Sequence, residues 1–465
     1  MARLVPLIWS LGCVFFLYAP VLEVSSSDVR RTYKLGFMLP FNADTACDAH
    51  LRSYAGQYAP AILVAMEHIR NDTSLNFNLT WVWNDTMCNE SKAIRQQVWQ
   101  LNNGVDAFFG PGKSCATTSR NALAFNKPVI SYECRDAPLA DKDVYKTLAR
   151  TSINNVHIVP PLLATLKQFK WKRVAIVYQK KIQWQMIYNY VSKVLAEEKN
   201  NITIALTESV QLDYKEFHQR NFQAVEASLR RISQTARIVI LLMSHELVIE
   251  YMLSAHKEGL VQTGEYAFIS FQLSPELLNH KIQMKWYFGE FSGPGYMEKI
   301  IKSFSALLIL QVRPITYGRH KNNSMTYSNF SAEVLRLSRE PPFKSDAYQG
   351  CLFVNNSSNC TERTCKCIFL KNTSLVPIEA ANLYHGIVQY AYALNRTLAK
   401  NQEPNGINII DALKGHTFDS IFGFDMTFDD QADVMFNMTL LHQEYVNGTK
   451  EKTNCVPFMP NEPCM

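Results

Sequence analysis

Residues 105–133 read VDAFFGPGKSCATTSRNALAFNKPVISYE, which is a complete strand–turn–helix–strand unit. The apolar run VDAFFG predicts a buried strand, SCATTSRNALAFN predicts a helix that begins at a Ser cap, and KPVISYE predicts the next strand. A helix between two strands at this spacing makes the strands parallel and covers the sheet with helices. The stretch therefore predicts an α/β fold.

The same alternation extends to both sides of this unit. Before it come the strand-like runs YKLGFML and NFNLTWVW, each followed by a helical pattern. After a turn-rich stretch near residues 135–150, the strand-like runs RVAIVYQ, ITIALTES, RIVILLM and EYAFISF again alternate with helical patterns. Two doubly wound halves form two lobes with a cleft between them. We expect residues 33–150 to start lobe I and residues 151–300 to start lobe II, each a mainly parallel sheet flanked by helices.

The pattern changes after about residue 285. SFSALLILQV predicts a crossing back to lobe I, PIEAANLYHGIVQYAYALNRTLA predicts a long amphipathic helix, and IIDALKGHTFDSIFGFDMTFDD predicts a helix, a turn and a hairpin. We expect residues 301–400 to return to lobe I, with a Cys- and Asn-rich surface insertion at about 313–375. Residues 401–450 are expected to complete lobe II, and residues 451–465 to form a tail.

The N-terminus has the features of a secretory signal peptide. One positive charge in Met1–Arg3 precedes the apolar run Leu4–Leu22, and EVSSSD follows. We expect residues 1–24 to be removed, with a retained anchor as the alternative. No other window approaches about 18 consecutive apolar residues, so we expect membrane contact only through a segment not present in this chain.

Fourteen Asn-x-Ser/Thr sequons support an extracellular address. They predict N-glycosylation at Asn71, Asn78, Asn84, Asn89, Asn201, Asn322, Asn329, Asn355, Asn356, Asn359, Asn372, Asn395, Asn437 and Asn447. The net charge of +6 is spread over 465 residues without a basic block. This distribution argues against a nucleic-acid partner.

Cysteine usage also fits an oxidising compartment. Cys13 leaves with the signal peptide, and an even number of cysteines remains, which predicts disulfides. Four of them, Cys351, Cys360, Cys365 and Cys367, lie in the Asn-rich insertion, and the sequence does not decide their pairing.

Signals of catalysis or metal binding are thin. GPGKS resembles the end of a phosphate-binding loop, but Ala107 stands where that loop needs its first glycine. HELVIE lacks the second histidine of a zinc-protease helix, and no G-x-S-x-G is present. The carboxylates Asp425, Asp429, Asp430 and Asp433 lack the spacing of a calcium loop and predict a solvated hairpin turn. We expect no catalytic residues, metal or cofactor.

Four stretches carry a resemblance to a known family. FFGPGKSC, NKPVISYEC, VYKTLART and LKQFKWKRVAIVY resemble the extracellular ligand-binding region of receptor guanylyl cyclases of the natriuretic-peptide receptor type, and the similarity covers residues 33–464. CVPFMPNEPC resembles the family's juxtamembrane cysteine pair, here Cys455 and Cys464. The resemblance implies a two-lobed fold of the type I periplasmic-binding-protein kind.

The family also implies a function. Its ectodomains bind a peptide hormone as homodimers, and the ligand rearranges the dimer so that an intracellular cyclase makes cyclic GMP. The cyclase would lie outside this chain, which would itself catalyse nothing. The alternative is a secreted soluble binding or decoy protein of the same fold. A secreted enzyme is a third hypothesis, which no catalytic constellation supports.

The resemblance carries over to a few residues. It implies a Cys88–Cys115 disulfide and a chloride held by Gly112 and Ser114, although Lys113 and Ser114 intervene before the cysteine. The alternative for this turn is purely structural, with Ser114 capping a helix.

The segment after PVISYE differs from the family's small-ligand relatives. Cys134 is expected to pair with Cys47, since both follow strands of lobe I. Arg135 could bind an acidic group, with a surface ion pair to Asp136 as the alternative. No cysteine lies between Cys134 and Cys351, so the natriuretic-type disulfide of lobe II is missing, which puts a natriuretic ligand in doubt. Peptide-contacting residues come from scattered loops and are not predicted.

Overall fold

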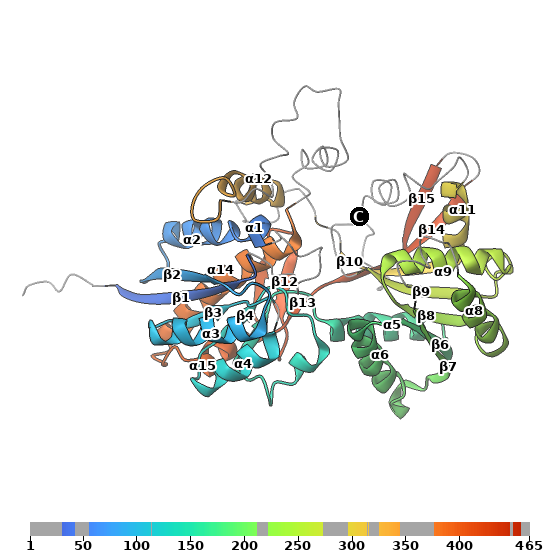
Figure 1. Ribbon diagram of the computed structural model, residues 1–465, viewed down its shortest axis with the longest axis horizontal. Helices are drawn as coiled ribbons and strands as arrows, with labels where there is room; N and C mark the ends of the chain where they lie inside the picture. The colour runs from blue at the N-terminus through green and yellow to red at the C-terminus, as the bar shows by residue number, and fades with distance from the viewer. Residues whose placement is uncertain are drawn as a thin grey trace, which may run out of the picture.

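The structure is a computed structural model that describes residues 30–41, 55–112, 114–211, 222–272, 296–313, 315, 325–344, 376–446 and 450–456. It forms two α/β lobes joined by crossing segments (Figure 1). Among the described residues, no helix is long and apolar enough to span a bilayer. The signal-peptide prediction falls on residues outside the described part.

Lobe I is built on a five-stranded parallel sheet. Its strands, in the spatial order β2-β1-β3-β4-β5, are β1 (Arg31–Leu39), β2 (Phe77–Asp85), β3 (Ala107–Phe109), β4 (Val129–Ser131) and β5 (Leu148–Arg150). The helices are α1 (Ala55–Tyr58), α2 (Ala61–Asn71), α3 (Glu90–Asn102), α4 (Cys115–Ala124), α12 (Tyr327–Leu337), α14 (Ile378–Ala399) and α15 (Gly406–Leu413). Apolar side chains of α2, α12 and α14 form the core on one face of the sheet, and α4 packs on the other.

Lobe II contains a seven-stranded mixed sheet. In the spatial order β15-β14-β10-β9-β8-β6-β7, its strands are β6 (Arg173–Gln179), β7 (Thr203–Val210), β8 (Ile238–Leu242), β9 (Ala267–Gln272), β10 (Leu307–Val312), β14 (Met438–Val446) and β15 (Lys450–Val456). Its helices are α5 (Val159–Gln168), α6 (Ile182–Leu195), α8 (Gln223–Thr235), α9 (His245–Lys257) and α11 (Tyr296–Ser303). The strands from β7 to β10 are parallel, and only β14 and β15 pair antiparallel.

These elements confirm the fold class that the sequence predicts. The strand–turn–helix–strand unit at 105–133 becomes β3, α4 and β4, and the four strand-like runs of the second half become β6 to β9. Buried strands of parallel sheets read as continuous apolar runs because both of their faces are covered, as the fully buried β8 shows.

Three lobe assignments need correction. SFSALLILQV does not cross back to lobe I, because its strand β10 pairs with β9 in lobe II and the crossing follows β10. Residues 401–435 belong to lobe I, where α15 and the small antiparallel sheet of β11 (Thr417–Asp419), β12 (Asp425–Phe428) and β13 (Val434–Met435) add to the core. Lobe II resumes only at β14, and residues 451–456, expected in the tail, belong to β15 of the lobe II sheet.

Part of the expected surface insertion is also core structure. Within 313–375, α12 buries Tyr327, Phe330 and Val334 in the core of lobe I. Residues 345–375, which hold Cys351, Cys360, Cys365 and Cys367, lie outside the described part.

Candidate functional site at the carboxyl edge of lobe I

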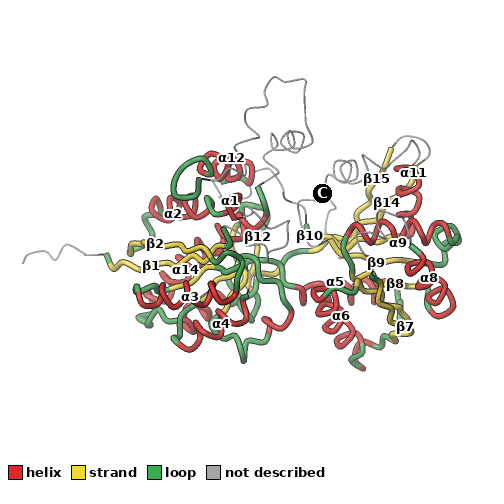
Figure 2. The backbone as a smooth tube through the Cα atoms, viewed as in Figure 1, coloured by secondary structure: helices red, strands yellow, loops and turns green. Residues whose placement is uncertain are grey.

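The carboxyl ends of the two main sheets face the crossing segments. β5 runs directly into the first crossing through a short 3-10 turn at Asn155–Ile158, β10 runs into the second, and β13 is linked to β14 by the third. The first and third crossings are among the loop segments between the lobes in Figure 2. Ligands of open α/β sheets bind outside the carboxyl ends of the strands. The segments that follow β3, β4 and β5 are therefore the candidate site on lobe I.

The turn after β3 requires glycine for its backbone shape. Gly110 and Gly112 have φ values of 104° and 77°, a region that residues with a side chain rarely adopt. A Cβ on Gly110 would collide with the Met38 carbonyl oxygen of the neighbouring strand. The glycines of GPGKSC therefore shape a tight turn against β1.

Ser114 does not cap α4 with its side chain, so that expectation is wrong. The residue is left-handed, with φ 63°, and its hydroxyl makes no capping hydrogen bond. Its carbonyl oxygen instead accepts from the backbone nitrogen of Thr118 at 3.3 Å and from the Thr118 hydroxyl at 3.1 Å.

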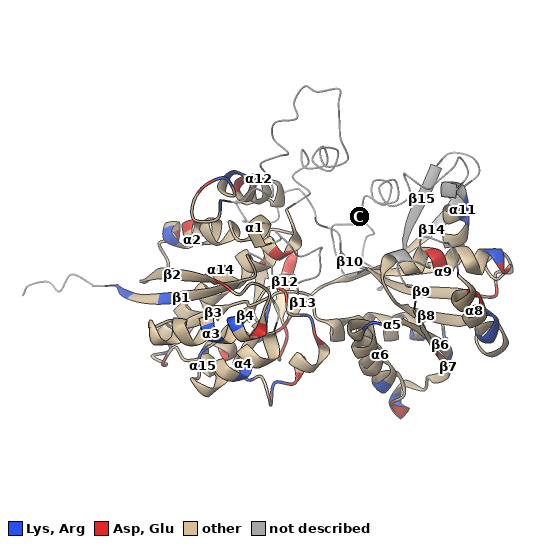
Figure 3. Cartoon of the chain, viewed as in Figure 1, with Lys and Arg blue, Asp and Glu red and all other residues tan. Residues whose placement is uncertain are grey.

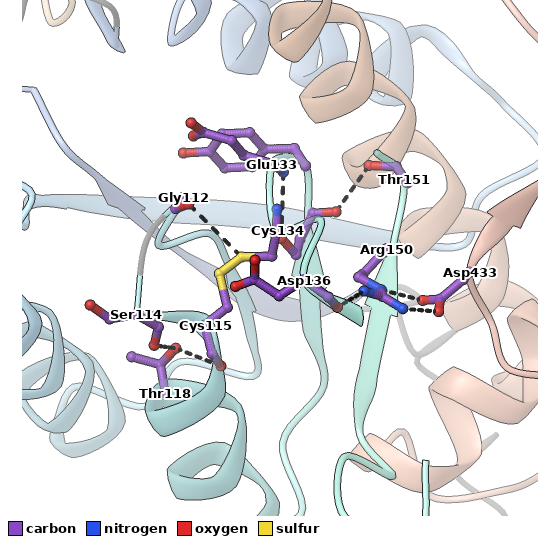
Figure 4. Close-up of a disulfide and its surroundings, with 12 residues drawn as sticks. Gly112, Ser114, Cys115, Thr118, Glu133, Cys134, Asp136, Arg150, Thr151 and Asp433 are labelled. Carbon is purple, nitrogen blue, oxygen red and sulfur yellow. Dashed lines mark hydrogen bonds and ion pairs between the residues drawn. A yellow bond between two sulfur atoms is a disulfide. The ribbon is translucent and has the colours of Figure 1, made fainter. Parts of the chain in front are cut away.

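Chloride at this turn stays a prediction, and a carboxylate stands close by. A Cβ on Gly112 would lie 2.5 Å from Oε2 of Glu133. Figure 4 shows Glu133, Gly112 and Ser114 around the disulfide. A negative charge this close disfavours a second anion beside Gly112.

Cys115 forms its disulfide with Cys134, at a Cα–Cα distance of 6.3 Å. This pairing corrects both Cys88–Cys115 and Cys47–Cys134. β3 and β4 are neighbours, with Phe109 opposite Ile130, so the residues that follow them meet at one edge of the sheet. Cys88 is also disulfide-bonded. Cys47 and Cys464 lie outside the described residues, while Cys455 lies in β15 opposite Leu441.

Disulfide mapping is expected to recover Cys115–Cys134 and to join Cys88 to Cys47. Of Cys47, Cys88, Cys115 and Cys134, Cys47 is the one left for Cys88, and it follows β1 in the sequence as Cys88 follows the neighbouring strand β2. Mass spectrometry of a non-reduced digest checks both bonds. The variant Cys134→Ser should expose one alkylatable thiol at Cys115 and leave Cys88 bonded. A Cys88–Cys115 peptide would contradict the assignment.

Polar groups along the candidate edge are already engaged within the chain. The Ser131 hydroxyl oxygen accepts from the backbone nitrogen of Cys134 at 3.0 Å, and the Thr151 hydroxyl donates to the Asn382 carbonyl oxygen at 2.7 Å. Arg135 pairs with Glu379 at 2.8 Å, so the expected pair with Asp136 is wrong. The small hydroxyls and Arg135 are thus bound before any ligand arrives.

Two tyrosines lie behind this edge as a neutral pair. The hydroxyl oxygens of Tyr58 and Tyr132 are 3.2 Å apart, and both side chains are buried. Burial raises the pKa of each tyrosine well above its ordinary value, and the nearby Glu133 raises it further. Both hydroxyls therefore stay protonated at physiological pH.

A buried ion cluster lies where β5 and β13 meet the crossings. The Arg150 guanidinium binds Asp433 through two hydrogen bonds, Nε to Oδ1 at 2.9 Å and Nη2 to Oδ2 at 2.5 Å (Figure 4). Lys142 Nζ lies 3.0 Å from Oδ1, and the Asn154 side-chain amide donates to Oδ2 at 3.1 Å. Asp433 is fully buried, so the expected solvated hairpin is wrong for this residue.

The cluster keeps its charges in the folded state. Burial acts to raise the pKa of Asp433, but the charges of Arg150 and Lys142 outweigh it and hold that pKa below the usual range. Burial lowers the pKa of Lys142, and the Asp433 charge opposes this. The cluster therefore fixes the ends of two crossing segments.

The sequons divide by exposure. Asn71, Asn78, Asn201, Asn329 and Asn437 are exposed, whereas Asn89 and Asn395 are half-buried. Asn322, Asn355, Asn356, Asn359, Asn372 and Asn447 lie outside the described residues. The side-chain oxygen of Asn84 accepts a 2.8 Å hydrogen bond from the buried Gln100 amide, and Thr86 of the same sequon is buried.

We expect Asn84 to carry little glycan while the exposed sequons are occupied. A glycan on the Asn84 amide would displace it from Gln100, which is itself anchored on the Phe37 carbonyl oxygen at 3.1 Å. Glycopeptide mass spectrometry after enzymatic deglycosylation measures the occupancy of each site. Asn78, on the same strand but exposed, is the matched comparison. Equal occupancy at Asn78 and Asn84 would contradict the expectation.

Comparison with known proteins identifies the family. The family described as "Receptor family ligand binding region" matches residues 57–442. The Resact receptor of Arbacia punctulata is 22% identical over 83% of this chain and 38% of its own length. Receptor-type guanylate cyclase Gyc76C of Drosophila melanogaster is 23% identical over 93% of this chain and 27% of its own length.

The Speract receptor of Strongylocentrotus purpuratus is 19% identical, over 82% of this chain and 33% of its own length. The chain thus spans between about a quarter and two fifths of these curated relatives. The matched region is the ligand-binding part of such receptors and not their catalytic cyclase part. The chain therefore belongs to the receptor family ligand binding region, in the form found in receptor guanylyl cyclases.

Proposed function

We propose that this chain is the extracellular ligand-binding region of a receptor guanylyl cyclase and that it takes a peptide-type ligand between its lobes. The observation that carries the proposal is the arrangement of two α/β lobes whose carboxyl edges face each other across three crossings. This geometry suits a ligand that changes the angle between the lobes. The cyclase would lie in a part of a longer protein outside residues 1–465.

The chemistry of the lobe I edge favours a peptide over a free amino acid. An amino acid would need a free cation or hydroxyl for its α-carboxylate, and Arg135, Ser131 and Thr151 are already engaged. The Glu133 carboxylate also lies at this edge. Two relatives are named the Resact receptor and the Speract receptor, which is consistent with a ligand that serves as a signal.

Signalling by this design needs a dimer, and lobe I has a suitable surface. Val98 and Trp99 on α3, Phe125 at the end of α4 and Ile407 on α15 are exposed, and we call this set the α3–α4 face. Asn126 accepts from the backbone nitrogen of Ile407 at 3.0 Å, which places Phe125 beside the start of α15. No sequon falls within residues 92–103, 119–127 or 402–414. An apolar face without glycans supports contact with a second copy.

The double variant Trp99→Glu with Phe125→Glu is expected to convert the dimer into a monomer. Trp99 and Phe125 are 48% and 57% exposed, so two carboxylates there cost the fold little and would be buried unpaired in an interface. Light scattering after size exclusion measures the mass. Ile182→Glu on lobe II, at a side chain that is 81% exposed, is the matched control and should leave the dimer intact. A dimer that survives the double variant would refute this surface.

A chimera tests the signalling proposal. The chain is joined to the membrane-spanning and cyclase part of a receptor-type guanylate cyclase, and cells are exposed to fractionated peptides while cyclic GMP is measured. A peptide that raises cyclic GMP through the chimera, but not through the Trp99→Glu/Phe125→Glu chimera, supports the proposal. A peptide that binds the purified chain but never raises cyclic GMP would favour a secreted binding protein instead.

A further inference from the structure

Two groups of cations in the described part of lobe II differ in how they are paired. On α8 and α9, Arg230 pairs with Glu258, Arg231 with Glu208 and Lys257 with Glu226. Figure 3 shows blue and red segments close together around these helices. The opposite charges of each pair largely cancel, so these residues present little net charge to a distant ligand.

The second group lies at the amino edge of the lobe II sheet and is largely unpaired. It consists of Lys167, Lys170, Lys172, Arg173 and Arg237, which we call the basic track. All five residues are exposed, and among the described residues the first four form no ion pair. Arg237 makes one long ion pair, to Glu265 at 3.5 Å, and also donates to the Ser233 carbonyl oxygen at 2.6 Å. Arg173 Nε donates to the Thr235 carbonyl oxygen at 2.9 Å, and neither of these carbonyl contacts neutralises the arginine charge.

The fold brings the basic track together at one end of the lobe II sheet. α5 ends at Gln168, one residue after Lys167, and a left-handed Lys170 with φ 58° turns the chain so that the Trp171 backbone nitrogen bonds the Leu166 carbonyl oxygen at 2.8 Å. The chain then enters β6 at Arg173. Since Val174 pairs with Ile238, Arg173 lies beside Arg237 of the strand next to it. The five cations therefore lie at the end of α5 and at the starts of the neighbouring strands β6 and β8.

Two aromatic rings brace the track. Phe169 stacks on Trp171 with centroids 4.7 Å apart, and Trp171 packs against the core of lobe II. The stacked rings, of which Phe169 is 39% exposed, therefore anchor the turn that carries Lys170 and Lys172 to the core of lobe II. Fixed cations bind a polyanion at a lower entropy cost than freely moving side chains do.

We propose that the basic track binds a linear sulfated polysaccharide. A group of exposed cations, four of the five without an ion pair among the described residues, attracts a polyanion and releases its counterions. A lipid surface suits it less, because anionic lipids are concentrated in the cytoplasmic leaflet. The inference relies on the proposed extracellular placement for where the chain would meet such a polymer.

The test compares two variants of equal charge. The track variant is Lys167→Gln, Lys170→Gln, Lys172→Gln and Arg173→Gln, and the control removes four paired cations of lobe II through Lys199→Gln, Arg230→Gln, Arg231→Gln and Lys257→Gln. Binding of the purified glycosylated chain to immobilised heparin is measured against salt concentration. We expect the control to stay close to the unchanged chain and the track variant to bind at least about tenfold more weakly, with a salt slope reduced by about 3.

Several outcomes would overturn the inference. If both variants weaken equally, the attraction is a net-charge effect; if the unchanged chain does not bind heparin at physiological salt, the track has no such ligand. Track-dependent binding to phosphatidylserine vesicles but not to heparin would replace the polysaccharide with a membrane. Circular dichroism confirms that each variant folds. The assay needs neither peptide nor cyclase, so a failed chimera and a failed track remain distinguishable.

Discussion

Replacing Asp433 with alanine is expected to lower the free energy of unfolding by about 3–5 kcal/mol, because it leaves Arg150 buried without its counter-charge. Arg150 is fully buried and makes two hydrogen bonds to Asp433. Its remaining contact, from Nη1 to the Asp136 carbonyl oxygen at 2.9 Å, cannot neutralise the charge. Urea unfolding followed by circular dichroism measures the change.

Asp430→Ala is the matched control, since it removes an exposed carboxylate from the same turn and should change stability by less than about 0.5 kcal/mol. The pair Arg150→Met with Asp433→Leu removes both charges and should be less destabilising than Asp433→Ala. Equal stability of Asp433→Ala and Asp430→Ala would mean that the buried pair contributes little to the fold.

The fold was accessible from the sequence because its signals are local. Each strand of the parallel sheets is an apolar run, and each helix follows at a spacing that fixes the βαβ unit. Local sequence patterns do not show to which lobe a strand belongs. The strand at Leu307–Val312 is apolar in either lobe, and only its pairing with β9 decides where it lies.

The site was predicted less well, for two physical reasons. Arg150 and Asp433 are 283 residues apart. Arg150 stands in VYKTLART and Asp433 in a carboxylate-rich turn, but neither stretch indicates that the two residues meet in a buried pair. Cys88–Cys115 was carried over from the family, and Cys47–Cys134 was inferred because both cysteines follow strands of lobe I. The sequence predicted β3 and β4 as parallel strands, but only their pairing as neighbours places Cys115 and Cys134 at one edge.

Acidification from pH 7 to pH 5 is expected to cost the fold about 2 kcal/mol through His385 alone. Burial lowers the pKa of His385 to about 3, because its ring is enclosed by apolar side chains, with the rings of Phe418 and Phe422 at centroid distances of 5.4 and 5.1 Å. Below about pH 6.5 the unfolded chain takes up a proton that the folded chain refuses until about pH 3. The stabilisation is therefore complete above pH 6.5 and is lost as the pH falls.

The variant His385→Gln should remove this slope. A glutamine oxygen can still accept from the Ile421 backbone nitrogen, which now bonds Nε2 at 3.1 Å, but it does not titrate. His68 and His416, whose pKa values are also lowered by burial, keep their share of the slope in both proteins. The stability gap between the unchanged chain and the variant should therefore shrink by about 2 kcal/mol from pH 7 to pH 5.

The variant His416→Gln provides the comparison. His416 is only half-buried, so this substitution should remove less of the pH dependence of stability than His385→Gln does. Urea unfolding at pH 7, 6 and 5 gives the three slopes under identical salt. Parallel slopes for the unchanged chain and His385→Gln would show that the folded state accommodates a charged ring at this position. In that case water would reach the His385 ring between Phe418 and Phe422 in solution, because hydration would then offset the cost of burying its charge.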